Sequence, residues 1–145
     1  MSARLDFYSS GPEAVKAMIG LEKQVAHSSL EKPLRELVRL RVSQINGCAY
    51  CMDMHASDAR KAGEELRRLS TVAAWRETTF FSKRERAALA WAEVVTRIGE
   101  DHVPDDMWSE VHENFSDTEI VDLTLLVVAI NGWNRFAISF RMQPA

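Results

Sequence analysis

The residues best suited to chemistry lie close together, between Glu36 and His55. This stretch holds both cysteines of the chain, Cys48 and Cys51, in a C-x-x-C arrangement, and His55 follows Cys51 by four residues. Because steps of three and four residues return to the same face of an α-helix, these three side chains would line one side of a helix that begins near Gly47. Two thiols beside an imidazole are the components of a proton-coupled thiol site.

The place of Glu36 depends on Asn46-Gly47, a dipeptide that typically breaks a helix. The residues before it, Leu34 to Ile45, contain no Gly or Pro and are predicted to be helical. If that helix continued straight, Glu36 and Cys48 would lie about 18 Å apart along its axis, at 1.5 Å per residue. A fold-back at the dipeptide would instead bring His55 within one helical turn of Glu36. The fold-back therefore predicts a carboxylate, an imidazole and two thiols in a line.

Length and composition indicate the class of protein. The 145 residues, 46% apolar and 27% charged, predict a globular chain with a single domain over residues 1–145. The net charge of −3, with basic and acidic residues interspersed, argues against binding to nucleic acid. The N-terminus lacks the apolar core of a signal peptide, and the longest apolar run, Leu125 to Ile130, is too short for a membrane span. The expected location is the cytoplasm, where a C-x-x-C is more often catalytic or metal-binding than structural.

Helical periodicity extends along the whole chain, and no stretch alternates with a period of two, so the predicted fold class is an all-α helical bundle. Ser-x-x-Glu capping boxes at Ser82 and Ser116 predict the starts of two helices. Pro12 and Pro104 indicate two further starts. Asn131-Gly132 is expected to break the chain once more, before a final helix.

An internal repeat links the two predicted breaks. The tripeptide I-N-G occurs at residues 45–47 and again at 130–132, an offset of 85 residues. A helix-turn-helix is therefore predicted twice. The second copy has bulky apolar side chains at the positions of the reactive residues, with Trp133 for Cys48, Phe136 for Cys51 and Phe140 for His55. Since the second hairpin does without the thiols and the imidazole, their presence in the first favours a chemical role.

The residues alone leave other roles open for the cysteine pair. Buried cysteines often behave as small hydrophobic side chains. Cys48, Cys51, His55 and Glu36 could also supply four ligands to a zinc ion, although structural zinc sites usually use two separated ligand pairs. A third possibility is a redox switch or scaffold, in which the pair toggles partner binding without turnover. A c-type haem is not expected, because Met52 occupies the position that haem attachment requires to be histidine.

The motif Glu36-x11-Cys48-x2-Cys51-x3-His55, within R-x-S-Q-I-N-G-C-A-Y-C-M-D-M-H, resembles the alkyl hydroperoxidase D (AhpD)-like branch of the carboxymuconolactone decarboxylase family. The resemblance extends through A-W-R-E-T-T-F-F-S-x-R-E-R-A-A-L-A-W-A-E at residues 74–93 and covers well over half of the chain. It implies an all-α fold with a helical repeat, assembly into trimers or hexamers, and peroxide reduction by the cysteine pair. Tyr50 replaces a second histidine of the family prototype. The decarboxylase branch lacks the C-x-x-C, so lactone chemistry is not expected.

Through this resemblance, Glu36, Cys48, Cys51 and His55 match the proton-relay and redox residues of a thiol-dependent peroxidase with peroxiredoxin-type activity. Glu36 would orient His55, which would take the proton of Cys51. Cys51 would attack the hydroperoxide, and Cys48 would resolve the sulfenic acid to a disulfide. A dithiol reductant, either a lipoyl protein or a thioredoxin-like protein, would then reduce Cys48, the sulfur expected to be more accessible. No cofactor or metal is expected.

Overall fold

The computed structural model describes residues 1–145 and contains helices but no strands, which confirms the all-α prediction. In chain order the elements are α1 (Phe7–Ser10), α2 (Pro12–His27), α3 (Lys32–Asn46), α4 (Ala49–Lys61), α5 (Leu66–Thr71), the 3-10 helix η1 (Val72–Glu77), α6 (Lys83–Thr96), α7 (Ile98–Asp101), α8 (Asp105–Asn114) and α9 (Asp117–Phe140). Both predicted capping boxes, at Ser82 and Ser116, are present at the starts of α6 and α9.

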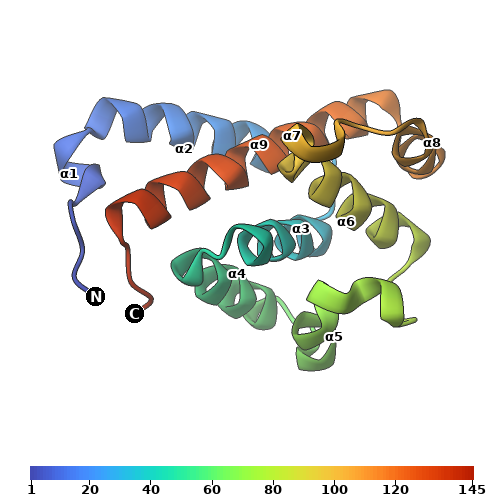
Figure 1. Cartoon of the computed structure of the whole chain (residues 1–145), viewed down its shortest axis with the longest axis horizontal. Coiled ribbons are helices and arrows are strands. Elements are labelled where there is room, and N and C mark those ends of the chain that lie inside the picture. Colours follow the sequence, from blue (N-terminus) through green and yellow to red (C-terminus); the bar gives the residue numbers. More distant parts are fainter.

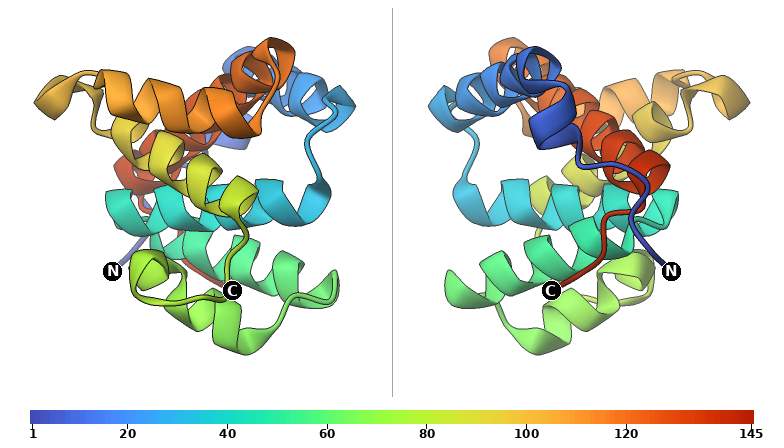
Figure 2. Two further views of the ribbon diagram at one scale, coloured as in Figure 1. Left: turned by 90° about the vertical axis from the view of Figure 1, so that its right-hand side faces the viewer. Right: turned by 90° about the vertical axis from the view of Figure 1, so that its left-hand side faces the viewer.

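The helices stack in layers with α3 in the middle. Figure 2 shows α2 and α9 on one side of α3, and α4 with α5 on the other. Accordingly, α3 buries side chains in two directions. Val38 packs into the main core with α6, α8 and α9, whereas Leu37 packs into a second cluster with α4, α5 and η1. A helix covered on both sides holds its remaining side chains, including Glu36, in a fixed position.

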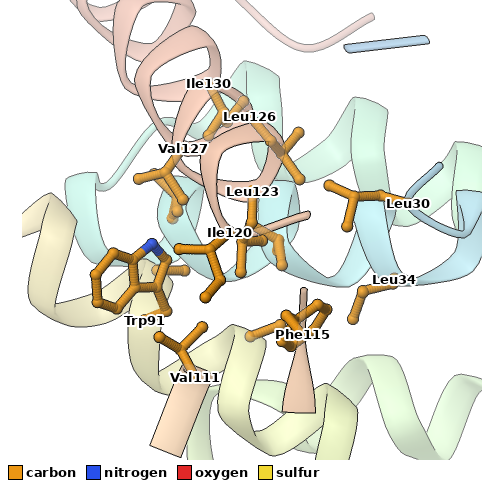
Figure 3. Packing of buried hydrophobic residues seen from close by; sticks show 14 of the residues in the cluster. Leu30, Leu34, Trp91, Val111, Phe115, Ile120, Leu123, Leu126, Val127 and Ile130 are labelled. Atoms are coloured by element: carbon orange, nitrogen blue, oxygen red, sulfur yellow. The ribbon is translucent and has the colours of Figure 1, made fainter. Parts of the chain in front are cut away.

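The main core is built around α9 and is drawn in Figure 3. Ile120, Leu123, Leu126 and Val127 of this helix are at most 5% exposed. By length and composition α9 is apolar enough to cross a membrane. Its contacts with α2, α3 and α6 are nevertheless those of a central core helix.

The fold-back predicted at Asn46-Gly47 is confirmed. Gly47 adopts a left-handed conformation, φ 70°, which glycine enters without a steric penalty. Its N–H bonds to the carbonyl of Gln44, and the N–H of Cys48 bonds to that of Ser43. These two bonds form a Schellman motif that ends α3. The chain then turns directly into α4, which packs antiparallel against α3 (Figure 1).

The break predicted at Asn131-Gly132 is wrong, because α9 continues through it from Asp117 to Phe140. Asn131 is held by tertiary contacts: its amide donates to Val127 and Thr96, and its oxygen accepts from Asn46 at 2.9 Å. Gly132 leaves room for the methyl group of Met18, which would lie 2.7 Å from a Cβ there. These contacts offset the helix penalty of glycine, about 1 kcal/mol. The two repeat asparagines therefore meet in space, but only the first copy turns.

Candidate active site

Glu36 and His55 are joined across the α3–α4 hairpin, as the fold-back predicts. Oε2 of Glu36 lies 3.0 Å from Nδ1 of His55, and the two residues are 5% and 8% exposed. Burial alone would raise the pKa of Glu36, but the hydrogen bond from His55 and the charge of Arg39 outweigh it and hold this pKa below its usual value. Glu36 is therefore a carboxylate that accepts the Nδ1 proton. His55 is left with Nε2 as its basic nitrogen.

The two cysteines lie at the start of α4 and are joined by a disulfide. Cys48 is the N-cap residue, and its sulfur accepts a bond of 3.3 Å from the backbone N–H of Cys51. The exposed fractions are 1% for Cys48 and 2% for Cys51, so both residues are buried in this oxidised form, and the greater accessibility of Cys48 stays a prediction. Tyr50 and Met142 cover the pair. Met142 comes from the segment after α9, whose position the local sequence does not reveal.

The side chains of the relay share a pocket of about 310 Å³. Glu36, Cys51 and His55 line it, whereas Cys48 does not. Much of the remaining wall is apolar and comes from α1, α4, α9 and the C-terminal segment: Phe7, Tyr8, Tyr50, Met54, Trp133, Ala137 and Met142. Cys48 instead borders a second hollow, beside Ile138 and Arg141. The two cysteines thus border different hollows.

Sequence reasoning missed a chain of hydrogen bonds in this pocket that joins Arg39, Glu22 and Trp133 to Glu36. Arg39 donates to Glu36 at 2.7 Å and to Glu22 at 2.8 Å. Glu22 also accepts a bond of 3.0 Å from the indole N–H of Trp133. The spacing of three residues between Glu36 and Arg39 was a usable signal, since such pairs meet on a helix. No local pattern connects Glu22 on α2 or Trp133 on α9 with the motif.

The arrangement suits proton transfer better than metal binding. Glu36, His55 and Asp58 do bring possible ligand atoms within 4.8 Å of one another. However, one oxygen of Glu36 is bonded to Arg39 and the other to His55. A metal ion would have to displace one of these partners and would sit beside the positive charge of Arg39. The donor set therefore fits poorly with the metal alternative that the sequence left open.

Comparison with known proteins gives consistent matches. The family model described as "Carboxymuconolactone decarboxylase family" matches residues 12–94. The uncharacterized protein YdfG of Bacillus subtilis is 45% identical over 145 residues, which is all of this chain and 99% of that protein. The uncharacterized protein YnjA of Escherichia coli is 29% identical over 75% of this chain and 59% of its own length.

Solved structures share the fold. A protein of unknown function from Agrobacterium tumefaciens, provisionally designated antioxidant defence protein AhpD, superposes with a TM-score of 0.97 at 41% identity over 99% of both chains. A peroxidase-related protein from Ralstonia eutropha JMP134 with an alkylhydroperoxidase AhpD core gives 0.84 at 22% identity, over 95% of this chain and 74% of its own. At that identity the second match speaks for the fold alone.

Proposed function

This chain belongs to the carboxymuconolactone decarboxylase family, in its AhpD-like branch, and from that premise we propose that it is a thiol-dependent peroxidase. The observation that carries the proposal is the buried hydrogen bond between Glu36 and His55 in the pocket that Cys51 lines. A carboxylate that fixes the tautomer of an imidazole one helical turn from a thiol is the arrangement that activates a nucleophile.

In the proposed reaction, Nε2 of His55 takes the proton of the Cys51 thiol while Glu36 stabilises the resulting imidazolium. The thiolate attacks the terminal oxygen of a hydroperoxide, the O–O bond breaks, and the alkoxide takes the proton back from His55. Cys51 is left as a sulfenic acid. The thiol of Cys48 then displaces water from it and forms the disulfide. The N-cap position of Cys48 supports this role, because a helix N-terminus stabilises a thiolate.

The cycle closes when a dithiol reduces the disulfide by exchange, and we propose a lipoyl or thioredoxin-like protein as its source. We further propose a homo-oligomer, a trimer or hexamer, in the cytoplasm. Exposed apolar side chains support the assembly: Trp108 is 47%, Val121 69% and Val128 51% exposed. Light scattering at micromolar concentration tests it, and a monomer alone would contradict it.

The test of the activity is peroxide turnover with a panel of dithiols, on the wild type and both cysteine variants. Cys51→Ser should abolish peroxide consumption and sulfenic acid formation. Cys48→Ser should form a trappable sulfenic acid at Cys51 but lose multiple turnover. If sulfenic acid is trapped in Cys51→Ser and not in Cys48→Ser, the two roles are reversed.

A redox switch is the second candidate, and the burial of both sulfurs favours it. A disulfide covered by Tyr50 and Met142 can form once and then resist exchange. Oxidation that stops after one equivalent of peroxide, with every dithiol tested, would support the switch and reject the peroxidase.

A further inference from the structure

One side of Glu36 faces His55, and the other side faces a cation that the proposed mechanism does not use. We propose that Arg39 is a positioning residue of the thiol site, which sets the orientation and charge of Glu36, and that Glu22 anchors Arg39 from the neighbouring helix. The inference rests on the proposed function, in which Glu36 and His55 move the proton of Cys51.

The geometry of Arg39 carries the argument. Its guanidinium spans two carboxylates, with Nη1 at 2.7 Å from Oε1 of Glu36 and Nη2 at 2.8 Å from Oε2 of Glu22. Each oxygen of Glu36 consequently has one donor, Arg39 on one and His55 on the other. With both oxygens bonded, the carboxylate plane cannot rotate without losing a charge-assisted bond. Its direction toward Nδ1 of His55 is therefore fixed.

Glu22 keeps the arginine in place. A long arginine side chain loses rotamer freedom when it is held, and a partner on a second helix offsets that cost. Glu22 comes from α2, and its other oxygen accepts the indole N–H of Trp133 on α9 at 3.0 Å. The side chain of Arg39 is 12% exposed and that of Glu22 is 30% exposed. These contacts thus link Glu36 and His55, on α3 and α4, to α2 and α9.

Few positive charges surround Glu36, so the charge of Arg39 matters for its ionisation. Arg39 is the only arginine or lysine that lines the pocket. Without it, Glu36 would be buried beside two other carboxylates with His55 as its only ionic partner. The titratable and charged groups facing Glu36 or sharing its pockets are Tyr8, Glu22, Arg39, Tyr50, His55, Asp58 and Glu64, joined in the reduced protein by Cys51.

The primary experiment follows the carboxyl carbon of Glu36 by NMR in the oxidised protein, labelled at its glutamates, with Glu36→Gln for assignment. Arg39→Gln should raise the titration midpoint of Glu36 by about one pH unit or more, the size of shift that a neighbouring arginine produces. Arg39→Lys, which retains the charge, should recover most of that shift. Arg60→Gln removes one exposed positive charge from α4, outside the pocket, and should leave the midpoint unchanged.

The second readout is the pH profile of the peroxide step in the reduced protein. Arg39→Gln should move the acid limb to higher pH, whereas a general loss of folded protein would lower the rate at every pH alike. Glu22→Gln should slow the step severalfold in the wild-type background and have no effect in Arg39→Gln, because the anchor acts only through the arginine.

The two proposals fail separately. If the wild type consumes no peroxide, the proposed function is wrong, yet the Glu36 titration still decides the role of Arg39. An unchanged Glu36 midpoint in folded Arg39→Gln would overturn the inference even in a fully active peroxidase. Equal effects of Glu22→Gln in both backgrounds would overturn the part assigned to Glu22.

Discussion

Replacing Glu36 by glutamine tests the relay most directly, because it removes one charge and almost no volume. Glutamine has a single acceptor oxygen, whereas Glu36 accepts from Arg39 at 2.7 Å and from His55 at 3.0 Å. An amide that keeps the bond to His55 must turn its NH₂ group toward the guanidinium of Arg39. Either orientation loses one charge-assisted hydrogen bond in a buried place.

The size of the effect follows from that loss. A hydrogen bond to a charged group contributes about 1.5–3 kcal/mol. In the proposed reaction the imidazolium on His55 forms as Cys51 gives up its proton, so the carboxylate acts mainly on the activated state. At about 1.4 kcal/mol per tenfold in rate, Glu36→Gln should slow the peroxide step about 10- to 150-fold.

The assay is rapid mixing of reduced protein with an organic hydroperoxide, followed by tryptophan fluorescence, to which Trp133 of the pocket contributes. Asp53→Asn is the matched control: it removes a carboxylate from α4, the helix of His55, two residues from that histidine, at an exposed position outside the pocket. Its rate should stay near that of the wild type, because exposed charges are screened. A Glu36→Gln protein that folds normally and reacts within threefold of the wild type would refute the relay.

Further predictions concern stability and access to the disulfide. Burial raises the pKa of Glu93, but hydrogen bonds from two arginines and a tryptophan outweigh it and lower this pKa. Its stabilisation is therefore present above the ordinary glutamate pKa of about 4.3 and is lost as pH falls through the lower folded value. Glu93→Gln should cost about 3 kcal/mol at pH 7 in urea unfolding, with a smaller cost near pH 3; equal costs at both pH values would contradict this. Met142→Ala uncovers the disulfide, so its reduction by dithiothreitol should accelerate severalfold; an unchanged rate would show that Met142 does not limit access. Asn46→Ala removes the amide that donates at 2.9 Å to the side-chain oxygens of Asn131 and Asn134. The free energy of unfolding in urea should fall by about 1–3 kcal/mol. An unchanged free energy of unfolding would mean that water replaces the amide.

Signals that act over one or two helical turns were readable in the sequence. The capping box at Ser82 satisfies backbone groups within its own first turn, so its pattern predicts a helix wherever the segment ends up in the fold. Gly47 similarly marks a left-handed helix end. Once that turn is placed, helical geometry alone brings His55 level with Glu36, and the contact between them needed no knowledge of the other helices.

The same local signal misled at Asn131-Gly132, where the sequence repeats the dipeptide of the first turn. A continuous helix and a turn differ there by about the helix penalty of glycine, near 1 kcal/mol. Packing against Met18 and hydrogen bonds to Thr96 and Asn46 are large enough to decide between them. These partners lie on other helices, so the sequence around residue 131 does not reveal whether the helix continues or turns.

Tertiary structure alone also decided the surroundings of the thiol site. The spacing of three residues could have placed Arg39 near Glu36, but its second partner, Glu22, comes from α2, and Trp133 reaches Glu22 from α9. The burial of Cys48 depends likewise on Met142, from the segment after α9. Sequence determined which side chains share a helix face, because that follows from 3.6 residues per turn. The packing of the whole core decides which helices cover that face. The covering helices in turn determine the charge around the thiol site and how far solvent and reductants can reach it.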